Sequence, residues 1–111
     1  MPEISEETKN LVIQFQNYQQ QLQSVLIQKE SLKLQAMEIE RALDELKENK
    51  EKKAYKIVGQ VMILKPVEEL KKELNETKEN INIRIKSLEK TEERLSNKLK
   101  ELQEKLKTVL K

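Results

Sequence analysis

Glutamate and lysine supply most of the side chains in this sequence that could carry chemistry. A pair of carboxylates can act as the acid and base of a catalyst, but it needs a concave pocket that shifts its pKa values. The 20 acidic residues are instead spread along segments typical of exposed helix faces. His and Cys are absent, which removes the commonest general base, the usual metal ligands and a thiol nucleophile. We predict no enzyme activity, catalytic residue, metal site or cofactor.

Sites for phosphate, nucleic acid and membranes also lack support. The single glycine leaves no glycine-rich loop to hold ATP. The 22 basic and 20 acidic residues alternate, so the net charge of +2 is not gathered on the basic face that nucleic acid requires. No signal peptide is recognisable, and no apolar run approaches the ~20 residues that span a bilayer. We expect a cytoplasmic protein with neither nucleic-acid nor membrane partners.

The elements that must position these side chains are long helices. Hydrophobic residues make up 36% of the 111 residues and charged residues 38%, with two Pro. Steps of four and three residues in the first half fall on apolar side chains with one exception, Lys29, which we interpret as a tolerated, register-setting residue of a coiled-coil seam. These positions are Leu11, Phe15, Tyr18, Leu22, Val25, Lys29, Leu32, Ala36, Ile39, Leu43 and Leu46. We predict a helix over 5–50 with Ser5 as its N-cap, although Pro2 could open it one turn earlier.

The second half carries a similar seam. Pro66 suits the first position of a helix over 66–111, and Glu92 interrupts the apolar pattern once in the second half of that helix. Near its start, Lys71 and Lys78 occupy seam positions, so the stripe there is broader or drifts. The apolar seam residues are Val67, Leu74, Ile81, Ile85, Leu88, Leu95, Leu99, Leu102, Leu106 and Val109.

The segment 54–64 between the seams is β-branched and aromatic, and we predict a β-hairpin there. Gly59 followed by Gln60 fits a two-residue type II′ turn, because Gly accepts positive φ without penalty. A buried helical stretch is the alternative. An isolated hairpin would expose two unpaired apolar edges, so we expect the chain to pair with other subunits through it. The expected assembly residues are Tyr55, Ile57, Val58, Gly59, Val61, Met62 and Ile63.

A short hairpin forces the two helices antiparallel, which predicts a mainly α fold, residues 1–111 forming a single domain. That pairing would also gather apolar residues near the two termini, among them Ile4, Val12, Ile13 and Leu110, which no core needs. This terminal patch consists of Ile4, Val12, Ile13, Phe15, Val109 and Leu110. Leu26, Ile27, Leu34 and Met37 lie farther in, where scattered exposed hydrophobic residues are normal.

Several short stretches are specific enough to suggest a family. The hairpin contains a Tyr-Lys-Ile-Val-Gly run followed by an apolar strand, spelled Ala54-Tyr55-Lys56-Ile57-Val58-Gly59-Gln60-Val61-Met62-Ile63. The flanking helices contain Gln19-Gln20-Gln21-Leu22-Gln23, Glu40-Arg41-Ala42-Leu43-Asp44-Glu45-Leu46, Glu92-Glu93-Arg94-Leu95 and Lys100-Glu101-Leu102-Gln103. With the single hairpin, these stretches resemble the β-type prefoldin subunits, most closely those of archaea. Gln60 departs from the family, which often has Asn there.

The resemblance implies a heterohexamer of two α-type and four β-type subunits, whose hairpins join in an oligomeric double β-barrel that carries six coiled coils. It also implies an ATP-independent chaperone that holds unfolded client proteins at the coiled-coil tips and delivers them to a group II chaperonin. We place client binding at the terminal patch. The alternative is a structural tether whose ends bind one folded partner, and a chaperone assay on unrelated clients would separate the two.

Overall fold

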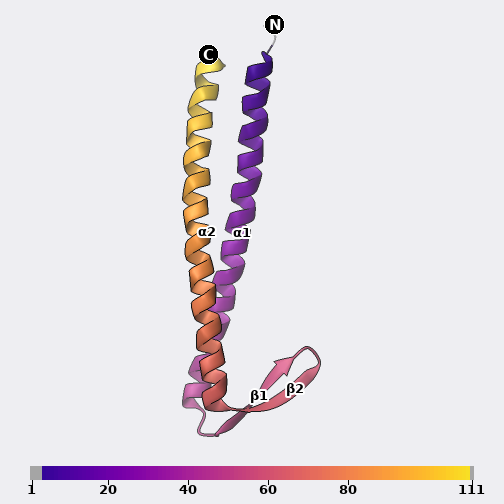
Figure 1. The fold of residues 1–111 in the computed structure, drawn as a ribbon, viewed down its shortest axis with the longest axis vertical. Coiled ribbons are helices and arrows are strands. Elements are labelled where there is room, and N and C mark those ends of the chain that lie inside the picture. Colours follow the sequence, from indigo (N-terminus) through magenta and orange to yellow (C-terminus); the bar gives the residue numbers. More distant parts are fainter. Residues whose placement is uncertain (1–3, 111) are drawn as a thin grey trace. The chain divides into compact units, whose positions relative to one another are not determined.

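A computed structural model of the chain describes residues 4–110 and contains two long helices separated by a hairpin (Figure 1). The elements are α1 (Glu6–Glu48), β1 (Lys53–Val58), β2 (Val61–Pro66) and α2 (Val67–Val109). The chain divides into two compact units, the terminal unit (Met1–Glu30 with Lys86–Lys111) and the hairpin unit (Ser31–Ile85). The predicted fold class, two long helices joined by one β-hairpin, is confirmed.

The start of α1 follows from its N-cap. The Ser5 hydroxyl oxygen accepts a hydrogen bond from the Thr8 backbone N–H at 3.1 Å, and the Ser5 carbonyl accepts the first helical bond from Lys9. The Thr8 side chain, in hydrogen-bond contact with Ser5 Oγ, is buried and extends the seam by one position. The alternative start at Pro2 lies outside the described residues. At the other end, Asn49 Oδ1 accepts a bond from the Glu51 N–H, which turns the chain toward β1.

The core of the terminal unit is the predicted seam. Val25 of α1 is buried, as are Leu88, Leu95 and Leu102 of α2. Within this unit the two helical segments run antiparallel (Figure 1), and Lys29 of α1 contacts Glu92 of α2. All the seam positions of α1 predicted from the heptad pattern are buried or half-buried in their own units. The four-three spacing therefore identified the buried face of the helix.

The hairpin unit has its own small core, formed by Val67, Leu70 and Ile81. The predicted role of Pro66 as the first helical residue is wrong. Pro66 pairs with Lys53 and ends β2, and α2 begins at Val67. Proline is tolerated at the end of an edge strand, where its missing N–H costs no ladder bond. The Val67 N–H donates to the Lys52 carbonyl at 2.8 Å, so strand passes into helix without a loop.

The hairpin turn has the geometry expected from its single glycine. Val58 pairs with Val61, leaving a two-residue loop, and Gly59 has φ of +60°. Gln60 does not share the positive φ, since no non-glycine residue between 4 and 110 has one. This combination is that of the predicted type II′ turn rather than type I′, in which both residues have positive φ.

Candidate assembly and client-binding surfaces

The hairpin presents two different faces. Side chains alternate along a strand and directly paired residues share a face, so Tyr55 with Leu64 and Ile57 with Met62 form one wholly apolar surface. We call these four residues the open face. All are more than half exposed, Ile57 reaching 71%. An apolar surface of this kind, on a ribbon with an unpaired edge on either side, requires a partner to bury it.

The opposite face is apolar only toward the turn. Val58, Val61 and Ile63 are exposed there, whereas Ala54 and Lys65 at its base are half-buried. Every residue predicted for assembly is thus exposed in the single chain. Leu64 was missing from the predicted set, although its alternation with Met62 was a sufficient signal.

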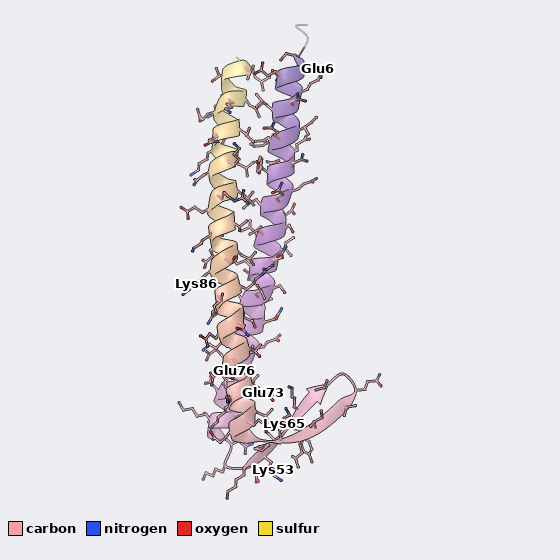
Figure 2. The ribbon with its side chains drawn as sticks, in the orientation of Figure 1. Glu6, Lys53, Lys65, Glu73, Glu76 and Lys86 are labelled. Carbon is pink, nitrogen blue, oxygen red and sulfur yellow. The ribbon has the colours of Figure 1, made fainter. Side chains whose placement is uncertain are left out.

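One carboxylate joins the base of the hairpin to α2. Glu73 accepts a hydrogen bond from Lys65 Nζ of β2 at 2.7 Å and another from Lys56 Nζ of β1 at 3.1 Å. Figure 2 shows Lys65 and Glu73 at this junction, with Glu76 on the next part of α2. The bonds from Lys65 and Lys56 hold the pKa of Glu73 below its ordinary value, and the same carboxylate raises the pKa of Lys65. We call these three residues the Lys-Glu-Lys clamp.

A groove of about 400 Å³ lies beside the clamp within the hairpin unit. Its apolar lining comes from both helices and from Tyr55 of the hairpin, which nevertheless remains 62% exposed. The apolar lining residues are Ala42, Leu46, Tyr55, Leu70 and Leu74. The hairpin unit therefore has an open apolar groove where Tyr55 faces the two helices.

The terminal patch lies in the terminal unit, where both ends of the described chain are found together (Figure 1). Ile4, Ile13, Val109 and Leu110 are exposed, each with roughly half of its surface or more in contact with solvent. Val12 and Phe15 are only half-buried, because they lie beside or in the seam. The structure thus brings the predicted residues to one end of the unit and leaves four of them exposed.

The polar interruptions of the two seams bind each other. Lys29 Nζ lies 2.6 Å from Glu92 Oε2, and the side chains are only 14% and 28% exposed. The hydrogen bond to Glu92 raises the pKa of Lys29. In the hairpin unit, Lys78 likewise pairs with Glu40. The Lys29–Glu92 pair could have been predicted from the sequence, because antiparallel pairing of the two seams places position 29 opposite positions just above 90.

Other kinds of site find no support in the described part of the chain. Residues 4–110 contain no group of three or more Asp, Glu, His or Cys side chains placed to hold a metal ion. None of the helices described there is long and apolar enough to cross a membrane. No buried side-chain nitrogen or oxygen in this part lacks a hydrogen-bond partner, so no orphaned polar atom marks a ligand site.

Antiparallel helical seams joined by an exposed apolar hairpin define a coiled-coil subunit built for assembly. Residues 9–111 match the family described as "Prefoldin subunit". The chain therefore belongs to the prefoldin subunit family, and the resemblance to its β-type members is confirmed. A chaperone-type role and assembly with other prefoldin subunits follow from membership, and the family is not known for enzymes.

Several similar proteins come from archaea. "Prefoldin subunit beta" of Archaeoglobus fulgidus is 40% identical over 111 residues, covering 99% of this chain and 96% of that protein. Its counterpart in Thermococcus onnurineus is 35% identical over 112 residues, covering 100% and 97%. The crystal structure of the prefoldin beta subunit from Thermococcus strain KS-1 superposes with a TM-score of 0.87 at 33% identity, covering 100% of this chain and 98% of that one.

Proposed function

We propose that this chain is the β-type subunit of an ATP-independent chaperone that binds non-native polypeptides and passes them to a group II chaperonin in the cytoplasm. In the proposed assembly four copies join two α-type subunits, and residues 1–111 of each act as one domain. The observation that carries the proposal is a family match over almost the whole chain, combined with apolar surfaces exposed at the hairpin and at the termini.

The hairpin supports the assembly half of the proposal. Its open face and its two free edges are costly in water for a lone subunit, and pairing with further strands in a closed sheet would bury both. Native mass measurement of the chain, alone and mixed with an α-type prefoldin subunit, tests this. We expect a hexamer in the mixture. A monomer under both conditions would contradict the proposal.

The terminal patch supports the client-binding half. Ile13 and Leu110 are exposed apolar residues in the same unit, so they can contact an unfolded chain without rearrangement of the seam. Each contact is weak, and several patches on one assembly would hold a client by avidity while allowing its release.

The test replaces these two residues with Ser in the variant Ile13→Ser/Leu110→Ser, which we call the patch variant. Val12 is left intact because it is half-buried. Ile83→Ser is the matched control, since Ile83 is equally exposed but lies in the hairpin unit. We expect the patch variant to form the hexamer but to lose most suppression of aggregation of several unrelated denatured proteins. Suppression equal to that of the control would contradict the patch assignment.

The tether alternative predicts a different result in the same assay. A subunit whose ends recognise one folded partner should not suppress aggregation of unrelated proteins. Delivery is tested separately, by adding a group II chaperonin with ATP to a preformed complex with the client. We expect the yield of refolded client to rise only when the chaperonin is present.

A further inference from the structure

Backbone connections alone do not fix how the hairpin sits on the helices of its own unit. One connection is the four-residue link 49–52 from α1, and the other is the direct junction between Pro66 and Val67. Both meet the hairpin at its base, so the ribbon can swing about that base while its internal ladder stays intact. The groove of about 400 Å³ beside Tyr55 leaves room for such a swing.

Side-chain ion pairs span this junction: the Lys-Glu-Lys clamp, and a longer pair of 3.7 Å between Lys65 Nζ and Glu69 Oε1 of α2. The carboxylate of the clamp belongs to the second turn of α2, and its two ammonium groups come from different strands. Lys56 and Lys65 lie on the same face of the hairpin, the one opposite the open face. The clamp therefore holds the ribbon by one face and leaves Ile57, Met62 and Leu64 of the open face free, while Tyr55 of that face borders the groove.

We propose that Glu73 is a positioning residue that fixes the angle of the hairpin on α2 and so presents the open face and strand edges for assembly. This inference rests on the proposed hexamer, in which hairpins from several subunits must meet in one closed sheet. Strand pairing needs N···O distances of about 2.7–3.2 Å, so a swinging hairpin would join such a sheet rarely. Preorganisation by the clamp lowers that cost before the subunits meet.

Exposed ion pairs contribute little to stability, and the clamp does not need to contribute more. Two charge-assisted hydrogen bonds to one carboxylate are directional, so they restrict the swing of the hairpin about its base. Their effect should therefore appear in the distribution of hairpin angles and in assembly, and only weakly in the melting temperature of the subunit.

The first test measures the angle directly in the whole chain. Cys is absent from the sequence, so Gln60→Cys at the turn and Asn80→Cys on α2 give unique positions for two spin labels within the hairpin unit. We expect a narrow distance distribution in the parent and a broad one after Glu73→Gln. Glu76→Gln is the control, because it makes the same charge change on α2 and Glu76 has no ion pair among the described residues. An unchanged distribution after Glu73→Gln would overturn the inference, whether or not the subunit assembles.

The second test measures assembly with an α-type subunit. We expect Glu73→Gln to raise the subunit concentration needed for half-assembly about fivefold, with no effect of Glu76→Gln. In the background Lys56→Gln/Lys65→Gln, the Glu73 substitution should have no further effect, because its partners are already gone. Equal losses in both backgrounds would show that Glu73 acts otherwise. A parent that forms no hexamer would refute the proposed function, while the spin-label result would still decide the clamp.

Discussion

At the residue scale, one charged pair lies inside the otherwise apolar seam of the terminal unit. Lys29 looked like an isolated polar residue in a coiled-coil stripe, and such residues often set register. The structure gives it a specific partner, Glu92, the interruption of the opposite seam. Opposite charges that meet only in the antiparallel alignment disfavour shifted or parallel pairings, because these would leave each charge facing apolar residues.

Replacing Lys29 with Leu tests this pairing. The change leaves the half-buried Glu92 carboxylate against an apolar side chain, so we expect the melting temperature of the subunit to fall by about 5 °C at pH 7. The double variant Lys29→Leu/Glu92→Leu should recover at least the parent value, since an apolar pair fills the seam. The measurement is thermal unfolding followed by far-UV circular dichroism.

The choice of pH follows from the sign of the Lys29 shift. Its hydrogen bond to Glu92 raises the pKa of Lys29 above 10.5, so the pair contributes fully below that pH and is lost only as the pH rises through the higher folded-state value. A melt at pH 7 therefore reports the whole contribution. A single variant as stable as the parent would show that the pair is not needed in the seam.

At the scale of the element, the two faces of each helix differ in solvent exposure. Leu95 is 1% exposed, while Ile83 on the same helix is 60% exposed. Both lose the same number of carbon atoms on replacement by Ala. We expect Leu95→Ala to lower the free energy of unfolding by about 3 kcal/mol and Ile83→Ala by less than about 0.5 kcal/mol, as measured by urea denaturation. Similar losses for both would contradict the assigned seam.

The heptad pattern could predict these helices because burial of one face imposes a period on the sequence. Gly59 could be placed in the turn because glycine accepts positive φ. The heptad pattern could not place Pro66, because proline is equally compatible with the last position of an edge strand and the first of a helix. The heptad pattern also could not predict the Lys-Glu-Lys clamp. Whether Lys56 and Lys65 reach Glu73 depends on the angle between hairpin and helix, and that angle leaves no periodic trace in the sequence.

For the terminal patch, sequence and structure each supply part of the assignment. The sequence identified apolar residues near the termini, of which Phe15 and Val109 also occupy seam positions. The structure divided the six residues into four that are exposed and two that are half-buried. Pattern alone could not make that division, because Val12 lies beside the seam and is partly covered by it. The exposed members are the ones to alter in a functional test.

At the scale of the whole assembly, the proposed function depends on several patches acting together. One patch of a few apolar residues binds weakly, whereas patches on several subunits joined in a hexamer can raise affinity by ~10²-fold or more. Loss of patches should then reduce client binding more steeply than in proportion to their number. Independent sites would instead lose activity in proportion.

Mixed hexamers distinguish these outcomes. Parent and patch-variant subunits are combined in known ratios with an α-type subunit, and suppression of aggregation of a denatured protein is measured at constant hexamer concentration. If suppression depends on the number of patch pairs in which both patches are intact, replacing half of the β-type subunits should leave about a quarter of the suppression. Mixtures with Ile83→Ser subunits should keep full activity, since Ile83 lies outside the terminal patch. A linear decline with the patch variant would show that each subunit binds clients alone, and the hexamer would then serve another purpose than avidity.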